Sequence, residues 1–402
     1  MKVEIAFDLA ANGVGNFLTL DDPVRGVLGD ADYPLAGDVL VDVTDTVRQV
    51  SIKRGRNRQL EKFTAGNATV VMDNRDRIYD PTNTSSPYFG SIVPRKEVTI
   101  SDLGVTLYTG MVADWNFNYS LSGDSVADVS CVDGLTLLVE PVLSSGTAVA
   151  ESTGDRVDAI LTDVGWPFAK RTISIGQATL DADFVGENVK ALDYLNKVSL
   201  SEPGALFVGA TGNLVFRDRA DLQDATRAVT FGTGGIPFSD IVVEFGVEEM
   251  ANKIAVTYYG GTAVAGTAVA TDTDSITAYG ELDANYDTLL GSLDDAQDLA
   301  SWQLGLYAQP QYRVDRITAT LDGLDVDDQQ TVLALELGDV VTVEWTPNNV
   351  GDPLSQVVSI DSIEFAGSPA RRQVSFSLSQ TTAAFILDDV FFGTLDNNIL
   401  AF

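Results

Sequence analysis

The residue types that could support catalysis are few in this sequence. The chain of 402 residues contains no histidine and a single cysteine, Cys131. Without histidine there is no imidazole acid–base catalysis, no Ser-His-Asp triad and no HExxH zinc motif. One cysteine cannot form an intrachain disulfide or a cysteine cluster for zinc or an iron–sulfur centre. Catalysis by this chain would have to use carboxylate, lysine, tyrosine or Ser/Thr chemistry.

Carboxylates are so abundant that no pair stands out by position. With 44 Asp and 14 Glu, any particular pair of acids is uninformative about glycoside hydrolysis. The acidic run 322–328 lacks the alternating ligands, central glycine and distal Glu of an EF-hand, which favours a solvated turn. The glycine-rich run 232–235 lies outside the strand–helix context of a phosphate loop. We therefore predict no catalytic residue, no metal site and no cofactor, and a protein that is not an enzyme. The alternative is a carbohydrate-binding or glycan-hydrolysing protein.

The overall charge limits which partners the chain can bind and indicates the environment in which it works. The net charge is -33, which argues against general binding to nucleic-acid phosphates. Acids are mostly Asp, and the bases are 17 Arg and 8 Lys. A surface rich in Asp and poor in Lys suits a halophilic host, because high salt screens the self-repulsion of such a charge. The alternative is an acidic protein of an ordinary host.

The basic residues gather in one segment. Nine of the 25 lie between Lys53 and Lys96. We predict that a basic surface here docks an acidic neighbouring subunit. The alternatives are local pairing of Arg75 and Arg77 with Asp73 and Asp76, and a nucleic-acid site. The candidate subunit-interface residues are Arg54, Arg56, Arg58, Arg75, Arg77 and Arg95.

Most of the chain is predicted to form strands. Runs of β-branched or alternating residues with Gly, Asn and Asp between them are typical of antiparallel sheets. The clearest runs are 40–43, 68–72, 98–100, 127–132, 254–259, 316–321, 340–345, 356–360 and 372–378. Apolar spacing of 3 and 4 predicts helices over 156–164, 189–198 and about 294–307. The segment 260–273, rich in Gly, Ala and Thr, is predicted to be a loop or hairpin.

The C-terminal stretch 383–402 is apolar enough to need a surface to pack on. We predict a subunit contact through Phe391, Phe392 and Phe402, with intramolecular packing as the alternative. No apolar run approaches the roughly 20 residues that span a bilayer. The N-terminus lacks the apolar core and cleavage site of a signal peptide.

The basic segment also carries an ordered set of short motifs. They are Arg54-Gly55-Arg56, Phe63-x-Ala65-Gly66-x-Ala68, Asp73-Asn74-Arg75-Asp76, Tyr79-Asp80-Pro81, Asn83-Thr84-x-Ser86-Pro87-Tyr88 and Pro94-Arg95. In this order they resemble the tail hub, or minor tail, proteins of long-tailed (siphovirus-like) phages. Weaker similarities continue to about residue 380, among them Leu107–Val112 and Gly212–Arg219.

The resemblance implies a mainly β fold with two tail-tube-like antiparallel β-barrel domains and small α/β inserts. It implies an N-terminal arm or strand pair (1–40), a first barrel (41–145), an α/β insert (146–230), a second barrel (231–382, helical insert about 275–310) and an apolar tail (383–402). Three copies would form a ring at the virion tail tip that closes or continues the tail tube, after synthesis in the host cytoplasm. The implied partners are the distal tail protein ring, the tape-measure protein and receptor-binding or tail fibre proteins, with DNA passing through the lumen. The alternative is a hexameric distal tail protein.

Overall fold

The chain folds mainly into antiparallel sheets. The computed structural model describes residues 1–8, 23, 38–56, 61–223, 227–247, 249–261 and 263–380. Strands make up 45% and helices 22%, which confirms the predicted mainly β class. None of the helices in these described ranges has the length and apolar character needed to cross a membrane.

The first half of the main sheet is an antiparallel array in the order β3-β4-β7-β6-β5-β1-β2. Its strands are β1 (Lys2–Asp8), β2 (Asp38–Asp42), β3 (Val47–Gly55), β4 (Thr64–Asp73), β5 (Glu97–Asp102), β6 (Val105–Asn118) and β7 (Val126–Val132). Alternation fixes which face is inward: in β7, Ala127, Val129 and Cys131 are buried and their neighbours are partly exposed. A short 3-10 helix, η2 (Thr44–Thr46), precedes β3, and another, η3 (Gly134–Leu138), follows β7.

The second half is built from the C-terminal strands. Its strands are β15 (Arg227–Gly232), β16 (Asp240–Phe245), β20 (Tyr312–Thr320), β21 (Val340–Trp345), β22 (Leu354–Ser368) and β23 (Arg371–Gln380). β16, β20, β23, β22 and β21 pair antiparallel in this order, and β15 adds to β21 in parallel. The helix α6 (Val326–Ala334) and the 3-10 helices η5 (Leu321–Gly323) and η6 (Pro347–Asn349) connect these strands.

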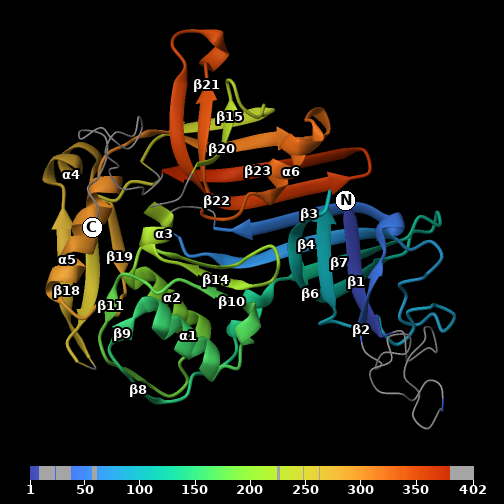
Figure 1. The fold of residues 1–402 in the computed structure, drawn as a ribbon, viewed down its shortest axis with the longest axis horizontal. Helices are drawn as coiled ribbons and strands as arrows, with labels where there is room; N and C mark the ends of the chain where they lie inside the picture. Colours follow the sequence, from blue (N-terminus) through green and yellow to red (C-terminus); the bar gives the residue numbers. More distant parts are fainter. Residues whose placement is uncertain are drawn as a thin grey trace.

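One long strand joins the two halves. β22 pairs with β21 through residues 354–359 and with β3 through residues 362–367, on the far side of a bulge between Ile360 and Ser362. The result is a continuous 13-stranded sheet, with the halves side by side along β3 and β22 (Figure 1). Within the described ranges its strand pairs follow an open path from β16 to β2. We call the β3–β22 junction the seam.

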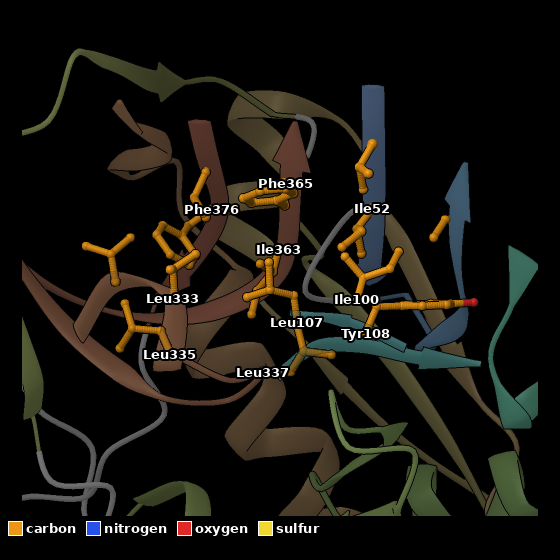
Figure 2. Close-up of a cluster of buried hydrophobic side chains, with 14 of the residues drawn as sticks. Ile52, Ile100, Leu107, Tyr108, Leu333, Leu335, Leu337, Ile363, Phe365 and Phe376 are labelled. Atoms are coloured by element: carbon orange, nitrogen blue, oxygen red, sulfur yellow. The ribbon is translucent and has the colours of Figure 1, made fainter. Parts of the chain in front are cut away.

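The main hydrophobic core extends across the seam. Ile52, Ile100 and Leu107 of the first half lie in the same buried cluster as Ile363 and Phe376 of the second. Figure 2 shows these side chains from the two halves facing one another, together with Leu333, Leu335 and Leu337 around α6. Burial of apolar area on both sides of the junction therefore stabilises the two halves as one unit.

An α/β insert covers one side of the sheet (Figure 1). It contains α1 (Thr153–Asp163), α2 (Ala191–Ser201), α3 (Arg219–Gln223) and η4 (Phe168–Lys170). Its strands are β8 (Gly146–Ala148), β9 (Glu151–Ser152), β10 (Arg171–Ile173), β11 (Thr179–Leu180), β12 (Asp183–Val185), β13 (Ala205–Val208) and β14 (Leu214–Arg217). A second buried cluster, which includes Val157, Leu161 and Leu195, holds it together.

A second insert interrupts the C-terminal half. It consists of β17 (Lys253–Tyr259), β18 (Val264–Thr271), β19 (Asp283–Tyr286), α4 (Thr273–Tyr279) and α5 (Leu293–Tyr307). The apolar face of α5, with Leu299 and Leu306, is buried together with Ile254 and Val256 of β17. Ser292 begins α5 by accepting a hydrogen bond from the Asp295 N–H.

The predicted helices correspond to α1, α2 and α5, and the predicted strand runs fall in strands except for their last residues at Val43 and Leu321. The segment 260–273 contains the second strand of the β17–β18 hairpin, one of its two predicted forms. The acidic run 322–328, predicted to be a solvated turn, differs in the structure: residues 322–323 lie in η5 and residues 326–328 form the first turn of α6, where the Asp325 side chain accepts from the Asp328 N–H. The domain bounds given above stay predictions, as does the role of the tail 383–402, which lies outside the described residues.

Candidate functional site

The basic segment begins at the seam. Arg54, near the end of β3, is 4% exposed, and its Nη1 donates to Glu336 Oε1 at 2.7 Å. The other oxygen of Glu336 accepts from the Ala210 N–H at 2.9 Å. This one acid therefore connects the first half, the second half and the turn between β13 and β14.

Arg56 makes the second tie across the seam. Its Nε and Nη2 donate to Asp361 Oδ1 at 3.0 and 2.8 Å, and its backbone N–H donates to the Asp361 carbonyl at 2.9 Å. Asp361 lies in the β22 bulge, a geometry that re-aims a side chain out of the regular ladder. The guanidinium carbon is 4.7 Å from the centroid of the Phe63 ring, a cation–π contact.

Gly55 explains why the Arg-Gly-Arg motif has glycine at its centre. Its φ is +107°, in the region that favours glycine. A Cβ at this position would lie 2.1 Å from the Asp361 carbonyl oxygen. The backbones of β3 and β22 therefore approach too closely here for any other residue without local rearrangement.

Arg75 and Arg77 lie in the ordered loop between β4 and β5 and pair locally. The Arg75 Nε is 2.9 Å from Asp73 Oδ2, and these hydrogen bonds lower the pKa of Asp73. The Arg77 Nε donates to Asp80 Oδ2 at 2.8 Å. Hydrogen bonds from Thr82, and then from Arg77, lower the pKa of Asp80. The side chains of Arg75 and Arg77 remain 61% and 55% exposed, so their pairs leave them accessible.

Arg95 differs from the other candidates. It is exposed, and its Nη1 lies 3.7 Å from the Met111 sulfur. Among the described residues no carboxylate lies within 4 Å of its guanidinium. Arg58 and the C-terminal candidates Phe391, Phe392 and Phe402 lie outside the described residues. Of the described candidates, Arg54 and Arg56 lie at the seam, Arg75 and Arg77 are in local ion pairs, and Arg95 is in no ion pair with a described residue.

A further tie between the halves has no sequence motif. Arg372 of β23 donates from Nη1 to Asp102 Oδ2 at 2.8 Å and from Nε to Asp322 Oδ1 at 2.9 Å. The Asp102 side chain is fully buried, and its other oxygen is 2.7 Å from the amino nitrogen of Met1. The pairing residues are 270 positions apart, so only the tertiary fold reveals the contact.

The buried acids act as hydrogen-bond acceptors for the backbone. Glu202 is fully buried and accepts from the N–H groups of Gln177, Ala178 and Arg219 and from the Thr153 hydroxyl. Four protein donors thus occupy this carboxylate. Across the described ranges, no group of three or more Cys, Asp or Glu side chains is arranged to hold a metal ion.

Asp133 follows the same pattern next to the basic segment. Its oxygens accept from the Gly66 and Leu135 N–H groups at 2.6 and 2.9 Å. Burial raises the pKa of Asp133 to about 6, against the opposing effect of these hydrogen bonds and of Arg54. This acid joins β4 to η3 and is not open to a substrate, because it is only 2% exposed.

A cavity of about 100 Å³ lies where the seam meets the two inserts. Arg56, Asp361 and Trp302 are among its lining residues. The Tyr286 hydroxyl and Gln303 Oε1 also face it and have no hydrogen-bond partner within the described chain. Its size and polarity suit a few water molecules, which would satisfy these groups.

Comparisons with known proteins show which solved structures have a similar fold. No family model and no curated protein matches the sequence. Among solved structures, the 43 kDa tail protein of prophage MuSo2 from Shewanella oneidensis is 18% identical with a TM-score of 0.60, over 86% of this chain and 96% of that one. The tail protein from Neisseria meningitidis MC58 is 13% identical with a TM-score of 0.55, over 86% of this chain and 94% of that one. The similarity to phage tail proteins expected from the sequence is thus confirmed at the level of the fold.

Proposed function

We propose that this protein is a structural component of a virus tail, located at the tail tip, where it forms a hub ring. The observation that carries the proposal is the extent of the structural likeness. It covers 86% of this chain and 96% of the prophage tail protein, so it extends far beyond a single β unit. A likeness limited to one β unit would leave the role open, because common β folds serve many functions.

The two strand groups support a hub over a hexameric distal tail protein. A distal tail protein would need one tube-like unit per chain, whereas this chain contributes two strand groups fixed together at the seam. Three copies then supply six such units and fit a sixfold tube. The proposed neighbours are the distal tail ring, the tape-measure protein and receptor-binding or fibre proteins.

The net negative charge of the chain supports a channel through which DNA passes without binding to the protein. At a net charge of -33, an acidic lumen repels phosphates, so a genome passes without adhering. Within the basic segment, the exposed residues Arg75, Arg77 and Arg95 are the ones we assign to contacts between subunits. Arg54 and Arg56 have partners within the chain and serve the seam.

Native mass spectrometry of the purified full chain, with electron microscopy of the same sample, tests the proposal. A trimer of about 129 kDa, three times the chain mass of 42.9 kDa, forming rings with a central channel is the expected result. A strictly monomeric protein in both low and molar salt would contradict the hub. Hydrolysis of glycans by the chain would favour the carbohydrate-active alternative.

A further inference from the structure

A groove lies where the first half of the sheet meets the α/β insert. It has a volume of about 290 Å³ and is bounded by Arg95, Met111, Leu137, Trp166, Pro167 and Lys170. We call this surface the β6–η3 groove, after two of the elements that line it.

Glycine and tryptophan shape the floor of the groove. The Trp166 ring lies over Gly134, where an added Cβ would be 2.7 Å from the ring. Trp166 Nε1 donates to the Lys170 carbonyl at 2.9 Å, which fixes the turn that carries Pro167 and Lys170. The concavity is therefore built by packed residues rather than left between loose segments. Leu137, which also lines the groove, is 40% exposed.

The charge of the groove is opposite to that of the chain. Arg95 and Lys170 both line it, and neither has a carboxylate within 4 Å among the described residues. Glu97 is the one acid in the lining, so the groove carries a net charge of about +1 in a chain of charge -33. Most other described basic side chains are in ion pairs, for example those of Arg54, Arg56 and Lys96. Two free cations beside an apolar floor suit a segment that is both apolar and acidic.

The sequence contains such a segment outside the described residues. Residues 383–402 include five phenylalanine or leucine positions in the run 385–395 and three acids, Asp388, Asp389 and Asp396, with no Lys or Arg. The described chain stops at Gln380, which pairs with Val358 in the second half of the sheet. The remaining 22 residues, if extended, reach roughly 70–80 Å, far enough to contact a neighbouring copy.

We propose that the β6–η3 groove binds the C-terminal segment 383–402 of a second copy of this chain. Aromatic side chains of the segment contact Leu137, Trp166 and Pro167, while its Asp residues pair with Arg95 and Lys170. This inference deepens the proposed ring, on which it rests, by naming the two surfaces that join neighbouring subunits. It gives a role to Arg95 of the basic segment and to the apolar C-terminal segment.

Cysteine cross-linking in full-length chains tests the contact. Cys131 is 1% exposed, so it contributes little background. One chain carries Leu137→Cys and the other carries Phe391→Cys, and the two are mixed and oxidised. We expect a cross-linked dimer that a synthetic peptide of residues 383–402 suppresses. Val350→Cys, at an exposed site directly after η6, replaces Leu137→Cys as the control and gives at least tenfold less product.

A matched charge pair tests the electrostatic part. Arg95→Ser/Lys170→Ser reduces cross-linking about tenfold at low salt, while Arg316→Ser/Arg371→Ser, the same charge change elsewhere, leaves it unchanged. The absence of any cross-link between chains overturns the inference. A single chain that carries both cysteines is the further test: if the cross-link forms only within that chain, the groove binds the chain's own C-terminal segment, and the inference is again overturned. A ring that persists without the cross-link overturns the inference alone, whereas a protein without rings overturns the proposed function.

Discussion

The Arg56–Asp361 pair allows a direct measurement of what the seam contributes to stability. Asp361 is 5% exposed and Arg56 18% exposed at their side chains. The change Arg56→Ala leaves a carboxylate in the seam without its guanidinium partner. Breaking a fully buried pair in this way costs about 3–5 kcal/mol.

The expected cost for Arg56→Ala is about 3 kcal/mol. The partial exposure of Arg56 and the adjacent cavity let water reach Asp361, which lowers the charge penalty to about 2–3 kcal/mol. Loss of the cation–π contact with Phe63 adds about 0.5–1 kcal/mol. The backbone bond from Arg56 to Asp361 is retained in the variant.

Urea unfolding, followed by tryptophan fluorescence, measures the effect. Arg75→Ala is the matched control, because its pair with Asp73 is exposed to solvent and contributes little to stability. The single variant Asp361→Ala and the double variant Arg56→Ala/Asp361→Ala complete a cycle with an expected coupling of about 1–2 kcal/mol. Salt should change this coupling little, since buried pairs are screened less than exposed ones. A loss for Arg56→Ala equal to that for Arg75→Ala, or a coupling near zero, would refute the reasoning.

Four other outcomes are expected. Gly55→Ala destabilises the fold by about 2 kcal/mol or more, because the φ of Gly55 is +107° and a Cβ there meets the Asp361 carbonyl. Gly90→Ala is the control in the same urea assay, because Gly90 also has a positive φ but open space around it. Equal losses of unfolding free energy in the two variants would contradict the close approach. The joint change of Arg75, Arg77 and Arg95 to Ser weakens assembly in native mass spectrometry but leaves the circular dichroism spectrum intact, and assembly at the original efficiency would limit these residues to local pairing. The midpoint of thermal unfolding rises by several degrees from dilute buffer to molar KCl, because salt screens the repulsion between acids. A chaotropic salt at equal ionic strength serves as the comparison. A midpoint that stays flat or falls with KCl would indicate an ordinary host. Burial raises the pKa of Asp133 to about 6, above its value in the unfolded chain, so its ionisation destabilises the fold above that pH. Lowering the pH from 7 to 5 therefore stabilises the original protein relative to Asp133→Asn by about 1 kcal/mol, and parallel pH profiles would contradict this.

The sequence was sufficient for elements whose signals are local. Alternating residues in β7 and helical spacing in α5 each repeat within a short window, and the caps lie next to the elements that they begin. α6 was missed because its first turn is a run of acids, which alone is equally consistent with a solvated turn. The helix becomes definite only through the Asp325 cap and the burial of Val332 and Leu333.

The seam could not be predicted in the same way. Arg54 and Glu336 are 282 positions apart, and Arg56 and Asp361 are 305 apart, with no periodicity to connect them. A cluster of cations in an acidic chain indicates a contact with acids, yet it does not say whether those acids belong to the same chain. The structure gives Arg54 and Arg56 internal partners, while the surface roles of Arg75, Arg77 and Arg95 stay predictions.

The distribution of cations also constrains how copies can associate. At a net charge of -33, two copies repel one another over most of their surfaces, and the repulsion is weakest in high salt. The chain has few cations, and most of those described are already paired internally. Association therefore has to rely on apolar contact at places where unpaired cations relieve the repulsion. The β6–η3 groove combines both features, because Arg95 and Lys170 flank the apolar floor formed by Trp166 and Pro167. High salt would therefore strengthen assembly overall, because it screens the repulsion between the remaining acids, but it would weaken the specific charge pairs. In a halophilic host the apolar part of the contact must then supply most of the affinity.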